Sequence, residues 1–335
     1  MANVNSISVR KEVKSPHTYL DTLAHLGKKG KEKPLQTAPP KAYTTNQESF
    51  QKRAKSKAIS DAMVFKLVAL ESKLNKSYWQ TYHCSRTVIQ DGNRLTARYC
   101  NQRFCTVCNR IRASKLMKAY LPSIDAMQDP QFVTLTRKNV KASYLRITIE
   151  DMVRKFDQSL DVLKKRGIRI KGIRKTESTI NETTFEMHPH FHVIVDGKEN
   201  AQLLVAEWYK RNQGVATLKA QDVRPLVDAM ELFKYFTKML TKSGQFLPVE
   251  MDKTFLAMRN KRVYQAFGGI RKESEDIEVK ESSECDWKDP QAEIWTFQSG
   301  GRFSDWYNAH GEALSEIEMQ EDTMHLIEKI SQERV

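Results

Sequence analysis

Apolar residues in the first third of the chain recur with the spacing of an α-helix. Over Ala54–Lys76 they fall on one face, which predicts a single amphipathic helix packed on a core. A second helix is expected over Asn109–Tyr120 and is ended by Pro122. The stripe of the first helix consists of Ile59, Met63, Leu67, Leu70 and Leu74.

Beyond residue 130 the pattern alternates between strand and helix. The predicted order βαββαβα indicates an α+β fold, with a split-βαβ antiparallel sheet of the ferredoxin or RRM-like kind and helices on one face. The opposite face is then free to carry a site. Strands are expected over Gln131–Arg137, Ile168–Thr179, His190–Val195 and Val215–Val223, and helices over Ile147–Arg166, Ala201–Arg211 and Pro225–Lys242.

One of these strands is unusually rich in histidine, with His188, His190 and His192 close together. Pro189 suits only the first residue of a strand, so we expect the strand to begin near His190. Side chains two residues apart point to the same face of a strand, so His190 and His192 could chelate one divalent ion while Phe191 faces a core. The alternative is a structural hairpin edge without a metal.

The polar face of the helix expected over Pro225–Lys242 combines an acid, a phenol and a lysine. Glu231, Tyr235 and Lys238 lie at i, i+4 and i+7, away from the apolar stripe. A tyrosine between lysines suits a phenol that must reach a phosphate. The alternative is an amphipathic surface helix with ordinary charge pairs, such as Glu231 with Lys234 or Lys238.

Four of the five cysteines lie within 25 residues, and two of them form a Cys-x-x-Cys pair. Clustered thiolates suit tetrahedral Zn²⁺, and a site closed by four protein ligands is structural. His83 could replace Cys84 as the fourth ligand. Free buried thiols are one alternative, and a redox pair is another, although it leaves two cysteines without a role. The expected ligands are Cys84, Cys100, Cys105 and Cys108.

Charge is distributed unevenly over the 335 residues, whose net charge is +14. Residues 271–335 carry 7 Lys and Arg against 17 Asp and Glu, so residues 1–270 hold a balance of +24. A basic body with an acidic end indicates a polyanionic partner, although a solvated basic surface explains the charge as well. No apolar run is long enough to span a membrane and the N-terminus lacks a signal-peptide core, so we expect a cytoplasmic protein.

Four motifs in order resemble those of the replication initiator proteins of rolling-circle plasmids, in the HUH endonuclease superfamily. Phe132–Thr136 is similar to the first motif, His188–His192 to the second, and Glu231–Lys238 to the third. Cys100–Cys108 resembles the zinc motif that precedes the nuclease domain in one branch. The similarity covers about residues 80–270, and the single tyrosine of the third motif fits the Glu–Tyr branch.

The resemblance implies roles for particular residues. His190 and His192 would bind catalytic Mn²⁺ or Mg²⁺ with an acidic residue of the neighbouring strand, where Glu177 is favoured over Glu186. Tyr235 would be the nucleophile. The remaining catalytic residues of the third motif would be Glu231, as a general base for water at termination, and Lys238.

The function implied by the resemblance is the initiation of plasmid replication. Such a protein nicks one strand at the double-strand origin through a 5′-phosphotyrosine, provides a 3′-hydroxyl primer, and rejoins or releases the strand at termination. Its partners would be origin DNA, bound as duplex and cleaved as single strand, together with host helicase and polymerase; a homodimer is compatible with this role. Alternatives are a transposase or mobilisation relaxase with the same core, and a non-enzymatic zinc-dependent nucleic-acid-binding regulator.

These features divide the chain into four expected segments. Residues 1–50 form a disordered basic arm, and residues 51–125 form a helical zinc-binding region. Residues 126–270 form the nuclease domain, and residues 271–335 form an acidic C-terminal tail. No role is assigned to the stretch between Gly244 and Gly269.

Overall fold

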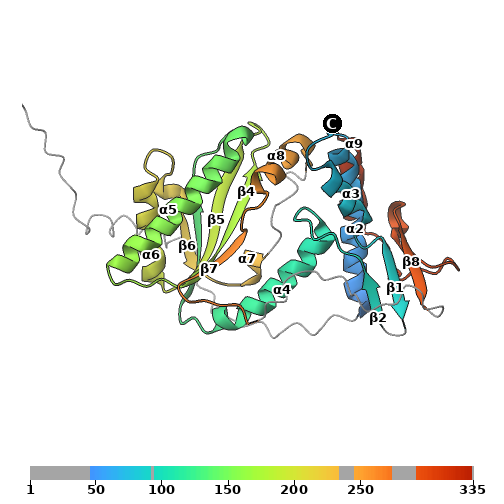
Figure 1. Cartoon of the computed structure of the whole chain (residues 1–335), viewed down its shortest axis with the longest axis horizontal. Helices are drawn as coiled ribbons and strands as arrows, with labels where there is room; N and C mark the ends of the chain where they lie inside the picture. The colour runs from blue at the N-terminus through green and yellow to red at the C-terminus, as the bar shows by residue number, and fades with distance from the viewer. Residues whose placement is uncertain (1–45, 92–93, 234–244, 274–291, 334–335) are drawn as a thin grey trace, which may run out of the picture.

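Two antiparallel sheets organise the chain, which the computed structural model describes over residues 46–91, 94–233, 245–273 and 292–333 (Figure 1). The larger sheet has the order β6-β3-β5-β4-β7, and the smaller has the order β2-β1-β8-β9. This mixture of helices and antiparallel strands confirms the α+β class. None of the helices in the described part of the chain is both long and apolar enough to cross a membrane.

The strands are β1 (Thr87–Asp91), β2 (Arg94–Ala97), β3 (Pro130–Thr136), β4 (Gly172–Ile180), β5 (Met187–Asp196), β6 (Asp222–Pro225), β7 (Tyr264–Phe267), β8 (Glu293–Gln298) and β9 (Asp305–Tyr307). The helices are α2 (Asn46–Val68), α3 (Asn75–His83), α4 (Thr106–Asp125), α5 (Leu145–Lys165), α6 (Lys198–Arg211), α7 (Met230–Phe233), α8 (Pro248–Met258) and α9 (Glu321–Gln332).

Four strands of the larger sheet follow the predicted order, β3-α5-β4-β5-α6-β6, and β7 adds a fifth strand that the pattern did not predict. Alternate residues of β5 point to α5 and α6, where Phe191, Val193 and Val195 pack with Phe156 and Trp208. Because side chains alternate along a strand, burying these three residues on the helix side turns the histidines of β5 to the other face.

Helices also border that other face. Ile173 and Ile194 point to it and pack with Leu116 of α4 and with Leu232 and Phe233 of α7. The expectation of helices on one face only is therefore wrong. The helix α4 precedes the sheet in the chain, so the strand and helix pattern beyond residue 130 carried no sign that it packs there.

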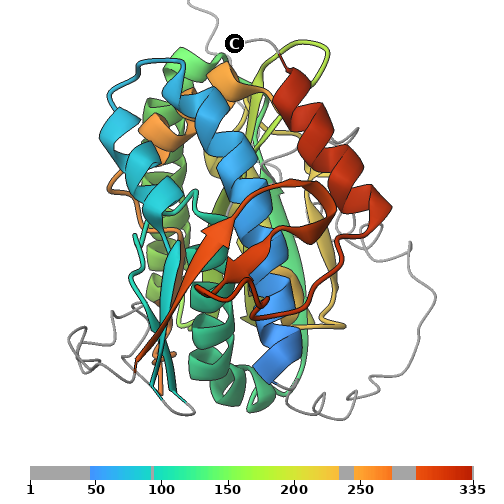
Figure 2. The same ribbon diagram turned by 90° about the vertical axis from the view of Figure 1, so that its right-hand side faces the viewer.

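The smaller sheet joins the two ends of the described chain. The strand β8 pairs with β1, so that Trp295 lies opposite Val88, and β9 extends the sheet. Trp295 and Trp306 pack with Ala54 of α2, and α9 lies beside the same helix (Figure 2). Within the acidic C-terminal segment, residues 292–333 form β8, β9 and α9, and Trp295 and Trp306 are buried against α2.

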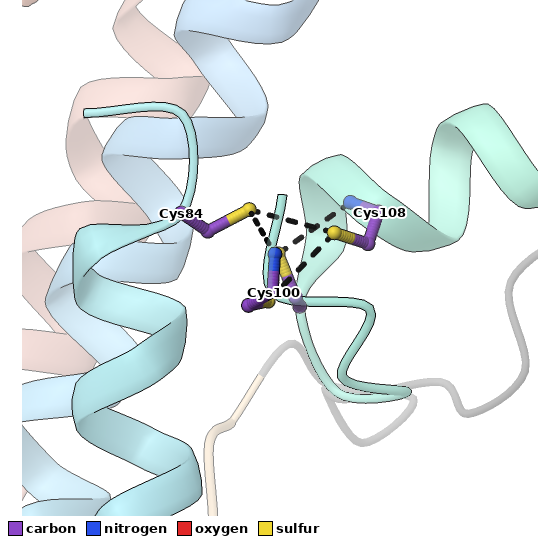
Figure 3. Close-up of side chains that lie close together, drawn as sticks. Cys84, Cys100 and Cys108 are labelled. Carbon is purple, nitrogen blue, oxygen red and sulfur yellow. Dashed lines mark hydrogen bonds between the residues drawn. The ribbon is translucent and has the colours of Figure 1, made fainter. Parts of the chain in front are cut away.

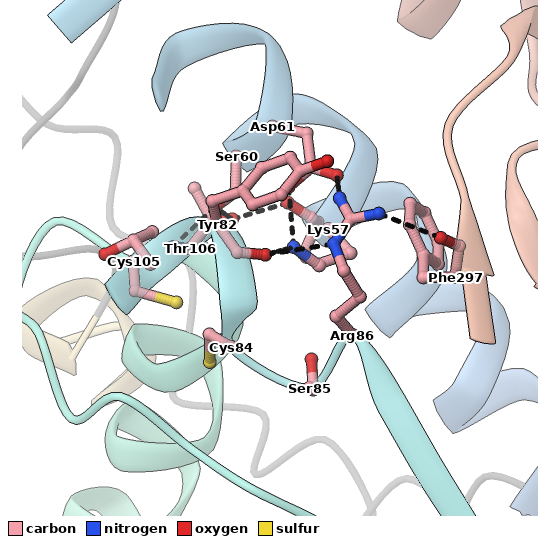
Figure 4. Close-up of polar contacts among 12 residues, drawn as sticks. Lys57, Ser60, Asp61, Tyr82, Cys84, Ser85, Arg86, Cys105, Thr106 and Phe297 are labelled. Atoms are coloured by element: carbon pink, nitrogen blue, oxygen red, sulfur yellow. Dashed lines mark hydrogen bonds and ion pairs between the residues drawn. The ribbon is translucent and has the colours of Figure 1, made fainter. Parts of the chain in front are cut away.

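A buried ion cluster ties α2 to this sheet (Figure 4). Lys57 and Asp61 are one turn apart on α2, and Lys57 Nζ lies 2.6 Å from Asp61 Oδ1. Arg86 Nη2 lies 2.5 Å from Asp61 Oδ2, and Arg86 Nη1 donates to the Phe297 carbonyl at 3.0 Å. Lys57 also donates to the Tyr82 carbonyl of α3. Burial raises the pKa of Asp61, although the two cations act in the opposite direction.

Two helix predictions in the first third of the chain are wrong in their bounds. The helix expected over Ala54–Lys76 is interrupted between α2 and α3, where Glu71 has a φ of +50°. The helix α4 continues three residues past Pro122, to Asp125. Pro122 lies in the last turn and is exposed, so solvent can satisfy the carbonyl that proline leaves without a donor. The region expected to be helical also contains the hairpin β1–β2.

Two further predictions fail around Pro225. The expected strand Val215–Val223 is reduced to β6, which runs from Asp222 to Pro225. The helix expected to begin at Pro225 begins at Met230 instead, because the Asp228 side chain accepts from the Met230 amide at 2.8 Å and caps α7. Proline is tolerated at the end of β6 because this strand is at the sheet edge.

Candidate functional site

The strands β4 and β5 place three of the predicted ligands side by side. In their antiparallel register Glu177 lies opposite His190, and Lys175 lies opposite His192. One donor atom from each of Glu177, His190 and His192 lies within 4.8 Å of the others. The structure thus brings together the residues that the resemblance implied, while their binding of a metal ion stays a prediction.

The alternative third ligand, Glu186, lies at the end of the turn between β4 and β5. Its carboxylate accepts from the Thr184 hydroxyl at 3.4 Å, and it is not part of the group formed by Glu177 and the two histidines. Glu177 is buried in the sheet face, with 4% of its surface exposed. The geometry therefore favours Glu177.

The strand β5 begins at Met187 and not near His190, so the expected start is wrong. Met187 exchanges backbone hydrogen bonds with Val140, at 2.7 and 2.8 Å. The backbone groups of Pro189 point to the same side of β5 as those of Met187, toward β3, because backbone groups alternate in direction along a strand. The β3 ladder has already ended at Thr136, so Pro189 costs β5 no ladder hydrogen bond.

Each imidazole is oriented through its Nδ1 atom. His190 Nδ1 donates to the His188 carbonyl at 2.9 Å, and His192 Nδ1 lies 3.3 Å from the Thr134 hydroxyl. This leaves Nε2 as the coordinating nitrogen, and His192 Nε2 lies 3.8 Å from Glu177 Oε2. Holding one ring nitrogen with a protein group so that the other can bind a metal is the usual arrangement of metal-ligating histidine.

A buried lysine adjoins the three residues. Lys175 Nζ lies 2.9 Å from Glu177 Oε2, and both side chains are almost completely buried. Burial by itself raises the pKa of Glu177, but Lys175 and the imidazoles of His190 and His192 outweigh it, so the pKa ends below its ordinary value. Glu177 is thus an anion at neutral pH, as a metal ligand must be.

The donor set fits a divalent cation. Two imidazoles and one carboxylate, converging from adjacent strands, suit Mn²⁺ and also permit Mg²⁺. Three protein donors are fewer than the ligands of a closed octahedral site. Coordination positions would therefore remain for a substrate oxygen.

Glu231 is connected to the site face of the sheet through Arg224 and Phe132. Its Oε2 lies 2.6 Å from Arg224 Nη2, and the Arg224 guanidinium lies over the Phe132 ring at 4.6 Å. The Phe132 ring in turn lies 5.1 Å from the His192 ring. The partner of Glu231 is therefore Arg224, which had not been considered from the sequence. The other predicted members of this group, Tyr235 and Lys238, lie outside the described residues, as does Lys234.

A stack of three rings fixes α7 against the sheet. Phe233 lies between Tyr120 of α4 and Tyr264 of β7, with ring centroids 6.2 and 5.6 Å away. The Tyr264 hydroxyl donates to the Leu232 carbonyl at 3.4 Å. The strand β7, in the stretch to which no role had been assigned, thus helps to position the helix that carries Glu231.

The four predicted cysteine ligands also come together, between α3, β2 and the start of α4 (Figure 3). Cys108 Sγ lies 3.4 Å from Cys84 Sγ and 3.7 Å from Cys100 Sγ. These separations exclude disulfides among them and approach the roughly 3.8 Å expected between thiolates that share one tetrahedral zinc. The Cys108 amide donates to Cys105 Sγ at 3.4 Å, which orients the thiolate. The alternative ligand His83 is outside this group.

The cysteines influence one another's ionisation strongly. Hydrogen bonds from Cys105, Cys108 and Cys84 hold the pKa of Cys100 far below its ordinary value. Burial raises the pKa of Cys105, and hydrogen bonds with Cys100 raise the pKa of Cys84 and of Cys108. Ionising all four thiols together is therefore unfavourable in the cluster by itself, and a bound cation would offset that cost. That this cation is Zn²⁺ stays a prediction.

Comparison with known proteins assigns a family likeness to the central part of the chain. Residues 93–200 match the model of a family described as "Replication protein". This span contains Glu177, His190 and His192, together with three of the four cysteines.

Individual relatives carry the description "Protein rep". The one from Staphylococcus aureus is 35% identical over 109 residues, which are 30% of this chain and 45% of that protein. The one from Streptococcus pneumoniae is 30% identical over 105 residues, which are 30% of this chain and 33% of that protein. A longer match, to the protein of Lactiplantibacillus plantarum, is 24% identical over 215 residues, or 55% of this chain and 68% of the relative. The chain thus spans between a third and a half of the first two relatives. No solved structure matches it.

Three residues of the site were not found from the sequence. Lys175 precedes Glu177 by two residues in β4, so strand periodicity alone places it on the same face. Arg224 and Tyr264 had no such signal, because each belongs to a strand that was misplaced or unassigned. Their nearness to the site depends on the pairing of β6 and β7 with the sheet.

Proposed function

We propose that the chain is a replication initiator that nicks one strand of plasmid origin DNA and retains the cut end on a tyrosine. One observation carries the proposal: Glu177, His190 and His192 meet on the face of an antiparallel sheet. The match of residues 93–200 to a replication-protein family supports the same reading.

Each part of the site has a role in this proposal. Glu177, His190 and His192 hold Mn²⁺ or Mg²⁺, which when bound stabilises the charge that builds on the phosphate in the transition state. Tyr235 follows Phe233 by two residues, and the ring stack around Phe233 fixes the helix from which the tyrosine segment continues. Lys238, assigned from the third motif, would complete the phosphate site.

The cleavage step is a transfer of the phosphoryl group between two oxygens. The Tyr235 phenolic oxygen forms a bond to phosphorus while the bond from phosphorus to the 3′ oxygen breaks. The phenolic proton ends on the released 3′-hydroxyl, and the 5′ phosphate remains on the tyrosine. The 3′-hydroxyl is then available as a primer, and the phosphotyrosine keeps the bond energy needed for rejoining.

The cysteine cluster has a structural role in the proposal. Zn²⁺ bound by Cys84, Cys100, Cys105 and Cys108 would fasten the start of α4 to α3 and β2. The same helix packs on the site face of the larger sheet. The zinc would therefore hold one border of the nuclease site.

Cleavage of origin-derived single strands tests the proposal. Incubation with Mn²⁺ should give, on a denaturing gel, a free 3′-hydroxyl fragment and a protein-linked fragment. Tyr235→Phe should give neither, whereas the matched control Tyr144→Phe, on an exposed residue, should cleave normally. His190→Ala with His192→Ala should also abolish cleavage while thermal stability and duplex binding stay near wild type. The paired control is His310→Ala with His325→Ala.

Two results would contradict the proposal. Cleavage by the double histidine variant would remove the metal assignment. DNA binding that requires zinc, without cleavage of any origin strand, would favour a non-enzymatic regulator.

A further inference from the structure

Lys175 adjoins the candidate metal site. It lies on β4 between His192 of β5 and Tyr264 of β7, directly opposite each of them. Its Nζ atom lies 2.9 Å from Glu177 Oε2, the same oxygen that lies 3.8 Å from His192 Nε2. An ammonium and a prospective metal-binding imidazole thus converge on one carboxylate oxygen.

A structural explanation accounts poorly for this lysine. Its side chain is 2% exposed, and replacing a buried ion pair by well-packed apolar side chains is often neutral or even stabilising. The residue two positions earlier on the same face is Ile173, which packs on α4 and α7. An apolar side chain would satisfy packing at this position too, so the charge calls for another explanation.

The charge of Lys175 opposes that of a metal ion. A divalent cation held by Glu177, His190 and His192 would lie a few ångströms from Nζ, and like charges repel strongly in a buried site. Lys175 also occupies an oxygen that the ion needs. An anionic phosphate beside both cations would remove the repulsion and give Nζ a new partner.

We propose that Lys175 makes metal binding depend on DNA, an inference that rests on the proposed nicking function. Without DNA, Lys175 pairs with Glu177 and lowers the affinity of the site for the divalent ion. With DNA, the scissile phosphate accepts the ammonium group and Glu177 is released to the ion. Metal and phosphate then strengthen each other's binding by the same factor, as linkage requires. Lys175 is a positioning residue in this scheme, because it acts through Glu177.

The affinity for Mn²⁺, measured by titration calorimetry in the absence of DNA, tests the inference directly. Lys175→Met should bind Mn²⁺ at least about tenfold more tightly than wild type, because it removes the competing charge and keeps the length of the side chain. Lys175→Arg retains the charge and should bind as weakly as wild type. The matched control is Lys171→Met. This substitution breaks the ion pair between Lys171 and Asp196, which has the same length, 2.9 Å, but is partly exposed.

A second titration adds a single-stranded oligonucleotide spanning the cleavage position, with Tyr235→Phe in every protein to prevent turnover. The oligonucleotide should tighten Mn²⁺ binding in the wild-type background and have a much smaller effect with Lys175→Met. If Lys175→Met does not fold, Lys175→Gln takes its place.

The outcomes separate this inference from the function on which it rests. Equal or weaker Mn²⁺ binding by a folded Lys175→Met overturns the inference, and Lys175 then serves only to hold Glu177. Absence of Mn²⁺ binding by wild type, with and without DNA, overturns the metal site itself. If His190→Ala no longer shows the Mn²⁺ binding that wild type shows, the measured ion is bound at this site.

Discussion

The two histidines of β5 owe their common direction to the apolar residues between and after them. Phe191, Val193 and Val195 are buried against α5 and α6, so a shift of one residue in register would remove all three from this core and turn them to the other face. Such a shift would also turn His190 and His192 away from Glu177. The hydrophobic core on one face of the sheet therefore sets the geometry of the site on the other.

Glu231 provides a prediction that separates termination from initiation. In the proposed cycle Tyr235 is occupied after the first cleavage, and a carboxylate acting as a general base could then activate water and end the cycle. General-base catalysis contributes roughly 10²–10⁴-fold, so Glu231→Ala should still nick and join while releasing strands slower by about that factor. Multimeric or protein-linked strands should accumulate in a replication assay.

The pairing of Glu231 with Arg224 supplies the control. Arg224→Ala leaves the carboxylate in place but removes the contact at 2.6 Å that holds it. If strand release is slow in Glu231→Ala and only slightly slowed in Arg224→Ala, the result supports Glu231 as the general base. Normal termination by Glu231→Ala would leave the ion pair as the whole role of the carboxylate.

Much of the site could be predicted from residue periodicity, and the rest depends on long-range pairing. A period of two places His190 with His192, and a hairpin brings Glu177 opposite His190. The burial of Lys175 could not be predicted, because a lysine inside a strand is ordinarily exposed. The Arg224 partner of Glu231 depends on β6 pairing with β3, which no local pattern specifies.

At the scale of elements, the cysteine cluster should be required for folding around α4. Structural zinc contributes folding free energy directly, on the order of 10 kcal/mol in small zinc modules. Cys105→Ser should lower the zinc content from one ion per chain toward zero, as measured by mass spectrometry, and lower the melting temperature. The control is Cys285→Ser, the fifth cysteine, which should change neither. A folded Cys105→Ser protein with full activity would contradict a structural zinc.

The buried ion cluster of α2 gives a prediction about stability. Asp61→Asn leaves Lys57 and Arg86 without their shared carboxylate, and breaking a buried ion pair costs about 3–5 kcal/mol. Chemical denaturation at neutral pH should report a loss of this size. Glu48→Gln breaks the exposed pair with Lys52 at the same helical spacing and should cost less than about 0.5 kcal/mol. Similar losses from both variants would mean that burial of the Asp61 pair adds nothing.

Elements with a sustained apolar period were easier to predict than short ones. The helix expected over Ile147–Arg166 agrees closely with α5 because its apolar face is continuous over several turns. The strand β6 has four residues, and its start is set by the hydrogen bonds of Gln221 rather than by apolar alternation. The described helical part of the third motif is likewise only α7, whose start is set by Asp228.

At the scale of the whole molecule, the C-terminal segment should be needed for stability. Ending the chain at residue 291 removes Trp295 and Trp306 from the core shared with α2. Loss of a buried tryptophan alone typically costs about 3–5 kcal/mol, so the region of α2 and β1 should melt earlier or aggregate. Removal of residues 334–335 alone is the control. Melting should be measured by calorimetry. An unchanged melting temperature after the longer truncation would show that the segment is dispensable.

The pairing of β1 with β8 has a consequence for the protein's synthesis. The strands of the larger sheet are all available once residue 267 has left the ribosome, whereas β1, which pairs with β2 on one side, has to wait for β8, more than 200 residues further along the chain. At roughly 5–20 residues per second this delay is about 10–40 s. A nascent chain can therefore form the sheet that bears the histidines while the edge of β1 in the smaller sheet is still exposed. A ribosome that stalls late would release a chain with that aggregation-prone edge unpaired.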